Sequence, residues 1–311
     1  MKKPILWLLP LLLMACNEPV AHQPTASAAS ATTASTTSSI SVEIPANLRT
    51  PASETWEGLL QQATDLRAYI KNTLPHTTPE QADALFEQYF EIMVALQNKF
   101  EQGNYDILTN YSDYFTSETE ANPELLAKQQ QLTELGLEFF PYGGGAAVIY
   151  TTPNHYLTLF GKQLSPNYYH LVSIFAKHDN EPETFDGVIT IGYDEYGQRL
   201  ADWEDYLAAA YPNNKWQPYV ECDVKDRRAV FLLGLENSPA FQTDGITLTE
   251  DAAEAWQNFT KQHPNSPTTA IIQSLQGNMS KKNMAAELEK RQPKAKDTSC
   301  QELYILNQTS K

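Results

Sequence analysis

The sequence predicts a mainly α-helical protein, built as an irregular array of helical hairpins with one short β-hairpin near residues 137–151. Three observations predict this class. Capping residues followed by proline recur along the chain, and apolar residues repeat at helical spacing after them. Two β-prone runs flank a glycine-rich turn in one segment that breaks the helical pattern.

Five expected helix starts share one design, in which Ser, Thr or Asn precedes proline. Proline lacks an N–H that would be unpaired in the first turn anyway, and the capping side chain accepts from a free amide. Thr78 and Thr247 also have Gln81 and Glu250 three residues on, which is a capping-box pattern. The five starts are Thr50-Pro51, Thr78-Pro79, Asn122-Pro123, Ser165-Pro166 and Ser266-Pro267.

Apolar residues at spacings of three and four indicate the helices themselves. One stripe runs from Trp56 to Ile70, and a second runs from Leu85 to Phe100 and ends at Gly103. A third, from Leu125, ends at Gly136. We expect further helices near 154–162, 166–178, 194–210, 214–235, 248–262 and 267–277.

The exception is the segment from Leu137 to Thr151, where β-prone runs flank Gly143-Gly144-Gly145. This predicts a hairpin that packs against helices, because a lone hairpin is marginally stable. A phosphate-binding loop needs nearby positive charge, and only Lys128 lies within fifteen residues, so we interpret the glycines as a turn. Residues 179–193 are ambiguous between loop, strand and helix start.

The N-terminus carries a targeting signal. Lys2 and Lys3 precede an apolar run from Ile5 to Ala15, which is shorter than the about 20 residues that span a bilayer. With Leu13-Met14-Ala15-Cys16 at its end, this segment resembles the lipobox signal peptides of bacterial lipoproteins. The resemblance implies cleavage before Cys16 and acylation of Cys16. If the source is Gram-negative, Asn17 in place of Asp at the next position implies the outer rather than the inner membrane.

Four parts follow from these patterns. Residues 1–15 are the signal peptide, and residues 16–46 combine the lipidated Cys16 with a disordered linker rich in Ala, Thr and Ser. Such a linker cannot bury enough apolar area to offset its ordering entropy. Residues 47–279 form the helical domain, and 280–311 form a mobile tail whose end a disulfide can tether.

The chain is acidic, with a formal net charge of −16 that becomes −18 once Lys2 and Lys3 leave with the signal. This charge repels nucleic acid, so we expect no nucleic-acid partner. No later stretch offers 18 consecutive apolar residues, so the acyl chains on Cys16 are the expected membrane attachment.

Cys222 and Cys300 are left once Cys16 is assigned to the lipid. In an oxidising compartment two such cysteines usually pair, and closing this loop adds about 4–5 kcal/mol by the chain-entropy estimate. Neither has a second Cys or His at metal-ligand spacing. We expect a disulfide between them, with two free thiols as the alternative.

One motif occurs twice: a Trp with a second aromatic three residues on, followed by a Pro-Asn turn that leads into the next helix. This layout is similar to the tetratricopeptide-like helical hairpins of envelope lipoproteins. Over about residues 136–275 the chain also resembles a group of uncharacterised bacterial lipoproteins, and this likeness implies a fold but no activity. The segments concerned are Trp203 to Tyr206 with Tyr211-Pro212-Asn213, Trp256 to Phe259 with His263-Pro264-Asn265, and Leu233-Gly234-Leu235-Glu236-Asn237-Ser238-Pro239.

Neither a nucleophile motif nor a metal motif is present. Gly-x-Ser-x-Gly does not occur, so serine hydrolase chemistry is unsupported. His170 and His178 lie about 12 Å apart along a helix, too far for one ion unless Asp179, Glu181 or Asp186 folds back. We expect no metal, no cofactor and no catalytic residue.

Two groups of side chains remain as candidates for binding. Tyrosine offers rigid contact area with a polar tip, and a groove lined by such residues would suit a peptide, although helix packing is an alternative use. Paired carboxylates can act on a glycan or bind one, although several also fit the acidic first turn of a helix. The aromatic candidates are Tyr142, Tyr168, Tyr169, Trp203 and Tyr206, and the acidic ones are Asp186, Asp194, Glu195, Asp202, Glu204 and Asp205.

The leading hypothesis is therefore a non-enzymatic, lipid-anchored cell-envelope protein, on the periplasmic or the surface side. Its helical domain would bind an envelope protein or peptide through the aromatic groove. The alternative is a cell-wall-directed enzyme or glycan binder that uses the carboxylates in 186–205.

Overall fold

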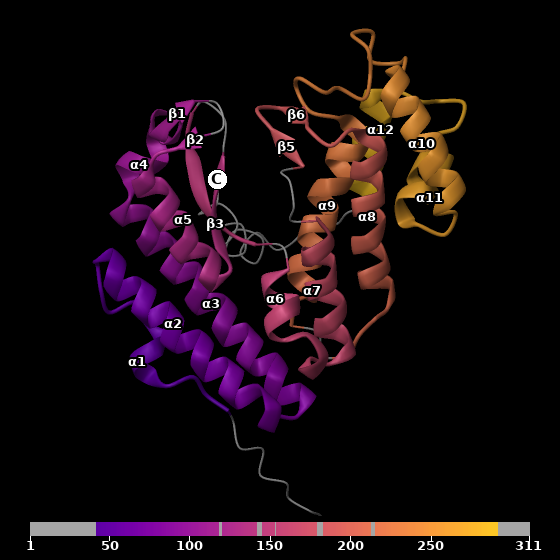
Figure 1. Cartoon of the computed structure of the whole chain (residues 1–311). Helices are drawn as coiled ribbons and strands as arrows, with labels where there is room; N and C mark the ends of the chain where they lie inside the picture. The colour runs from indigo at the N-terminus through magenta and orange to yellow at the C-terminus, as the bar shows by residue number, and fades with distance from the viewer. Residues whose placement is uncertain are drawn as a thin grey trace, which may run out of the picture. The chain divides into compact units, whose positions relative to one another are not determined.

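The mainly α class with a short β-hairpin is confirmed by the computed structural model, which describes residues 42–117, 120–141, 145–152, 154–178, 183–212 and 215–291. Short 3-10 turns lie at Leu74–His76, Tyr111–Tyr114 and Gly161–Gln163. Figure 1 shows the elements, which are α1 (Ala46–Arg49), α2 (Trp56–Thr73), α3 (Pro79–Gly103), α4 (Tyr105–Thr109), α5 (Pro123–Leu135), α6 (His155–Leu159), α7 (Pro166–His178), α8 (Tyr193–Ala208), α9 (Gln217–Leu233), α10 (Glu250–Gln262), α11 (Pro267–Ser274), α12 (Lys281–Arg291), β1 (Phe115–Ser117), β2 (Glu120–Ala121), β3 (Leu137–Pro141), β4 (Ala147–Thr151), β5 (Thr184–Phe185) and β6 (Val188–Ile189).

Four of the five expected proline starts are confirmed, at α3, α5, α7 and α11. Thr78 and Gln81 form a complete capping box at the start of α3. The start at Thr50-Pro51 is wrong, because α1 ends there and α2 begins only at Trp56. The side chain of Thr55 caps α2 by accepting from the Gly58 N–H at 3.2 Å.

The capping box expected at Thr247 is also wrong. The backbone N–H of Thr247 donates to Asp244 Oδ1 at 2.8 Å, so this residue belongs to a turn that precedes the helix. Thr249 stands at the N-cap of α10 instead. The local pattern was ambiguous because two threonines lie close to the same helix start.

The described part of the chain begins at residue 42, within the segment 16–46 that we expected to be a linker. Ile44 is fully buried, and its N–H donates to Gln88 Oε1 of α3 at 3.0 Å. Tyr69 Oη of α2 donates to the Glu43 carbonyl at 2.9 Å. A few apolar residues at the end of a polar linker therefore dock on the domain, which average composition could not reveal.

The expected hairpin is formed by β3 and β4, which pair antiparallel from Leu137 opposite Thr151 to Pro141 opposite Ala147. It packs against α5 and α3. The helices also satisfy two backbone amides of the hairpin, because Gln129 Oε1 accepts from the Phe139 N–H and Glu101 Oε1 from the Ile149 N–H, both at 3.0 Å. Two shorter antiparallel pairs, β1–β2 and β5–β6, accompany it.

The ambiguous region 179–193 contains the β5–β6 hairpin and the start of α8. Asp186 and Gly187 both have positive φ, 46° and 72°, as a two-residue hairpin turn requires. Residues 179–182 lie outside the described part of the chain.

The helical-hairpin array is seen in the second half of the domain. The most extensive contacts of α8 are with α10 and α9. Helix α11 packs against α10. The two copies of the Trp-x-x-aromatic motif, on α8 and α10, therefore lie on helices that pack against each other.

The segment 280–311, which we expected to be a mobile tail, includes α12 at residues 281–291. Met284 and Leu288 are buried, and the helix packs against α9 and α11. These two apolar residues lie one turn apart and form a narrow apolar stripe on the helix. The segment is rich in charged residues, so its average composition does not indicate that stripe. Residues 292–311, with Cys300, lie outside the described part.

The segment from Leu233 to Pro239 has a structural role. Asn237 Nδ2 donates to the Asp186 carbonyl at 2.7 Å, and the Ile189 N–H donates to Ser238 Oγ at 3.0 Å. Gly234 ends α9 with φ at 75°, and a Cβ there would lie 2.3 Å from the backbone N of Ala240. The segment thus ties the β5–β6 hairpin to the end of α9, and only glycine fits its tightest point.

Gly234→Ala should lower the free energy of unfolding by more than about 2 kcal/mol, because it adds a backbone clash to the cost of positive φ. Gly245→Ala is the matched control, since Gly245 also has positive φ (67°) but open space around the added Cβ. It should cost about 1 kcal/mol. Equal losses in urea denaturation would show that the clash at Gly234 is absent.

His155 is a buried polar residue that the sequence did not single out. It lies at the start of α6, and its Nε2 hydrogen-bonds Tyr89 Oη of α3 at 2.7 Å. Burial lowers the pKa of His155 from 6.5 to about 4, and the positive charges of Arg67 and Lys71 on α2 act in the same direction. The imidazole is therefore neutral in the folded protein at neutral pH.

Stability should fall as the pH drops from about 6.5 to about 4, because the unfolded chain then takes up a proton at His155 that the folded chain does not. The loss from this group is about 3 kcal/mol across that window. His155→Gln should make urea denaturation less dependent on pH there. The same change at the exposed His76 is the control, and equal pH profiles of the two variants would contradict the assignment.

Candidate functional site

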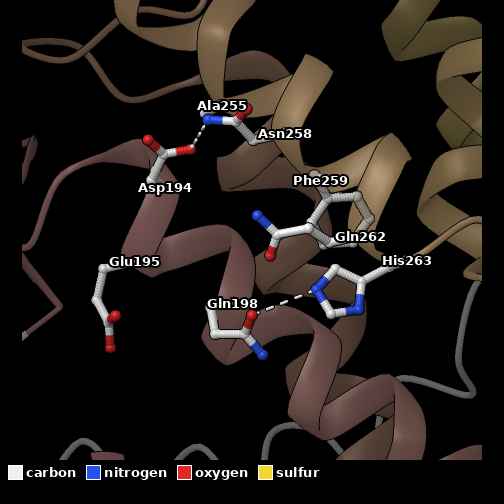
Figure 2. Close-up of a pocket in the computed structure, with 8 residues that line it drawn as sticks. All are labelled: Asp194, Glu195, Gln198, Ala255, Asn258, Phe259, Gln262 and His263. Atoms are coloured by element: carbon white, nitrogen blue, oxygen red, sulfur yellow. Dashed lines mark hydrogen bonds between the residues drawn. The ribbon is translucent and has the colours of Figure 1, made fainter. Parts of the chain in front are cut away.

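A pocket of about 350 Å³ lies between α8 and α10 (Figure 2). Three of its residues come from the first turns of α8, four from α10, and one from the C-terminal cap of α10. No lysine or arginine is among them. The lining residues are Asp194, Glu195, Gln198, Ala255, Asn258, Phe259, Gln262 and His263.

Helical spacing explains why these residues share one face. Asp194 and Gln198 are four residues apart on α8, as are Asn258 and Gln262 on α10, and such pairs lie one above the other. Because α8 and α10 pack together, the two rows face each other across the pocket. Phe259 and Ala255 belong to the buried face of α10 and form its apolar wall.

Two hydrogen bonds join the helices across the pocket. Asn258 Nδ2 donates to Asp194 Oδ1 at 3.2 Å, and His263 Nε2 bonds Gln198 Oε1 at 3.3 Å. Gln198 Nε2 also donates to Asp202 Oδ1 at 3.3 Å, which orients the amide. Because Gln198 Oε1 can only accept, His263 Nε2 is the donor in this hydrogen bond.

Behind the pocket, a chain of ion pairs surrounds the buried side chain of Arg199. Arg199 is only 2% exposed, and its Nε donates to Glu195 Oε1 at 3.1 Å while its guanidinium also contacts Glu183 at 3.5 Å. Glu183 pairs with Arg227, which pairs with Asp223 at 2.5 Å. Burial lowers the pKa of Arg227, but the carboxylates of Asp223 and Glu183 outweigh burial and hold it raised.

The sequence reasoning missed these arginines. Glu195 with Arg199 and Asp223 with Arg227 are i,i+4 pairs, which was the available signal. That signal normally marks exposed helix faces. Only the packed structure shows that the Arg199 side chain is buried and that of Arg227 largely covered.

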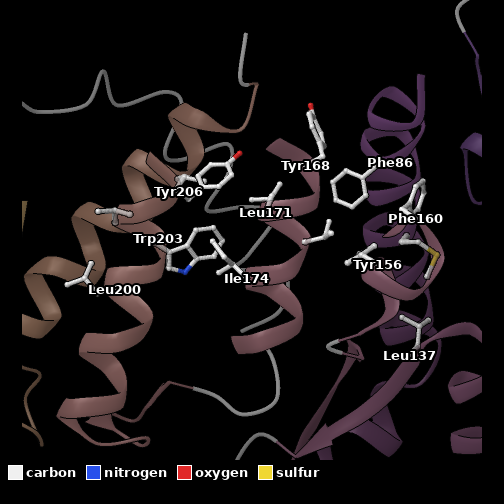
Figure 3. Packing of buried hydrophobic residues seen from close by; sticks show 14 of the residues in the cluster. Phe86, Leu137, Tyr156, Phe160, Tyr168, Leu171, Ile174, Leu200, Trp203 and Tyr206 are labelled. Atoms are coloured by element: carbon white, nitrogen blue, oxygen red, sulfur yellow. The ribbon is translucent and has the colours of Figure 1, made fainter. Parts of the chain in front are cut away.

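Three of the five residues expected to line an aromatic groove do not line one in the structure. Tyr168, Trp203 and Tyr206 are buried. Figure 3 shows Trp203 and Tyr206 on α8, next to α7, and Tyr168 on the side of α7 that faces Phe86. Tyr206 Oη donates to Asn167 Oδ1 of α7 at 2.6 Å. Tyr169 is 47% exposed, and Tyr142 lies outside the described residues. Three of the rings that we expected to face a ligand are therefore buried in contacts between helices.

The carboxylates of 186–205 are dispersed by the fold. Asp194 and Glu195 reach the pocket, whereas Asp186 lies in the β5–β6 turn and Glu204 is buried. Asp202 accepts from His178 Nε2 at 2.7 Å and from Lys177. Burial raises the pKa of Asp202, but these two hydrogen bonds outweigh burial and lower it to about 2.

The two histidines of α7 do not converge. His178 pairs with Asp202, and His170 Nδ1 hydrogen-bonds Tyr211 Oη at 3.0 Å. Over the described ranges, no three His, Cys, Asp or Glu side chains are grouped so that they could hold a metal ion. Asp179 and Glu181 lie outside those ranges.

Cys222 lies on α9 and is disulfide-bonded. Its partner lies outside the described residues, as do Cys300 and Cys16. The Cys222–Cys300 pairing therefore stays a prediction.

Glu204 joins three helices near the pocket. Its Oε1 accepts from Arg228 Nε of α9 at 3.0 Å and from Thr268 Oγ1 of α11 at 2.6 Å. Its Oε2 accepts from Ser266 Oγ. Ser266 in turn caps α11 by accepting from the Thr268 and Thr269 amides at 3.0 and 3.3 Å.

Glu204→Gln should destabilise the protein by about 3–5 kcal/mol, because it leaves the Arg228 guanidinium, 12% exposed, without a compensating charge. The double variant Glu204→Gln with Arg228→Met removes that charge and should recover part of the loss in urea denaturation. A double variant no more stable than the single one would show that the ion pair is not the origin of the loss.

Comparison with known proteins yields no relative: no family model, curated protein or solved structure matches the chain. Within the described ranges, no helix combines the length and the apolar character needed to cross a membrane. The features of this chain that bear on its function are therefore the signal-peptide pattern of its sequence and the pocket between α8 and α10.

Proposed function

We propose that this chain is a lipid-anchored cell-envelope protein whose helical domain binds a peptide or protein partner at the pocket between α8 and α10. Acyl chains on Cys16 are the proposed anchor. The signal-peptide pattern of residues 1–16 supports this proposal. The binding role moves from the expected aromatic groove to the pocket, because three of the five rings of the groove are buried.

The observation that carries the proposal is the preorganisation of the pocket. Gln198, Asn258, Asp194 and His263 are held by hydrogen bonds before any partner binds, and Glu195 is held by Arg199. Binding a partner then costs little side-chain ordering. Its volume of about 350 Å³ is near the lower end of ligand sites, which suits one side chain of a larger partner.

A glycan in the same pocket is the second candidate. Two carboxylates and the amides of Gln198, Asn258 and Gln262 can hydrogen-bond sugar hydroxyls. Hydrolysis is less well supported, because it needs carboxyl groups on both sides of the scissile bond. Asp194 and Glu195 are consecutive residues in one turn of α8 and line the same wall.

A photoreactive amino acid at Gln262 of the full-length protein should crosslink the partner in intact cells, because this side chain lies in the pocket and is exposed. The same substitution at Gln257 is the matched control, since it is exposed on α10 but does not line the pocket. Mass spectrometry of the adduct distinguishes a peptide from a glycan. Equal adducts at both positions, or none at either, would contradict the pocket as the binding site.

A further inference from the structure

We infer that the pocket between α8 and α10 recognises a primary ammonium group on a short aliphatic stem. The inference rests on the proposed function and names the chemistry of the group that enters the pocket. The ammonium can come from a side chain of a peptide or from a free diamine, and both present the same chemistry to the pocket.

The first argument is the balance of donors and acceptors in the pocket. Asn258 and Gln198 have already used one amide hydrogen each to bond the carboxylates of Asp194 and Asp202. The second carboxylate oxygens of Asp194 and Glu195 and the side-chain carbonyls of Asn258 and Gln262 can all accept further hydrogen bonds. The lone pairs of these oxygens outnumber the amide hydrogens that remain on Gln198, Asn258 and Gln262, and a group with three N–H donors and no acceptor complements them.

The second argument is charge. The lining contains two carboxylates and no lysine or arginine. The basic residue behind the wall, Arg199, is turned inward and paired with Glu195 and Glu183. The chain as a whole carries a formal net charge of −16, which attracts cations and repels anions at longer range.

The third argument is the apolar wall. Ala255 and Phe259 are buried in the helix interface and present carbon to the pocket opposite the polar rim. Methylene groups can lie on such a wall while the ammonium reaches the acceptors. An aromatic ring also attracts a cation placed over its face. A polyol would leave this wall without an apolar contact.

Titration calorimetry of the full-length protein tests the inference with three probes. Nα-acetyl-lysine N-methylamide should bind about tenfold more tightly than Nα-acetyl-norleucine N-methylamide, which keeps the stem and lacks the charge. Cadaverine supplies the free diamine. Tighter binding of the lysine probe would assign the group to a peptide, and tighter binding of cadaverine would assign it to a free diamine.

Asp194→Asn should weaken the lysine probe by about fivefold to tenfold, and Glu195→Gln by a similar factor. Glu195 also pairs with the buried Arg199. Asp194→Asn is therefore the variant that leaves the ion pairs of Arg199 intact. Glu254→Gln is the matched control, an exposed acid of α10 outside the pocket, and it should leave binding unchanged.

Equal affinities for the lysine and norleucine probes, or equal effects of Asp194→Asn and Glu254→Gln, would overturn the inference. So would the absence of binding by both ammonium probes. If a partner still crosslinks at Gln262 in that case, the proposed function stands and only the ammonium assignment falls. If nothing crosslinks there, the proposed function falls as well.

Discussion

The carboxylate of Glu204 is the interaction on which the second half of the domain depends. It is buried and receives hydrogen bonds from α9 and from the start of α11. A buried charge of this kind is costly unless every partner is in place, so it favours one arrangement of these helices over alternatives. Because α10 and α11 are joined by a short turn, fixing the start of α11 also fixes α10 against α8.

That arrangement is what creates the pocket. Its two walls are different helices, and neither wall alone would place an acceptor opposite an apolar surface. The ion pairs from Glu195 through Arg199 and Glu183 to Arg227 hold the α8 wall from behind. The residues that line the pocket are thus held in place by side chains that do not line it.

Much of the fold could be predicted because its signals are local. The capping box at Thr78, the proline starts of four helices and the β3–β4 hairpin each depend on residues within a few positions of one another. Errors arose where a local signal was duplicated or diluted. The threonines before α10 offered two caps, and the two apolar residues of α12 were hidden among charged neighbours.

The candidate site could be predicted only in part. Asp194 and Glu195 were among the expected acidic residues, but the pocket also needs Asn258, Gln262 and His263, which lie more than sixty positions further along the chain. Their amides and imidazole had no signature in the sequence. Conversely, Trp203 and Tyr206 were expected to face a ligand, because a sequence does not show which side of an aromatic helix will be covered.

The sequence by itself determined the helical class, most helix starts and the signal-peptide pattern that predicts an envelope address, because caps, periodicity and an apolar run are local properties of the chain. Only the tertiary structure decided which aromatic rings are buried, which ion pairs are internal and which polar residues line the pocket. These properties depend on which faces of α7, α8, α9 and α10 meet. That choice is made by long-range packing and by buried charges such as Glu204, whose partners are distant in sequence.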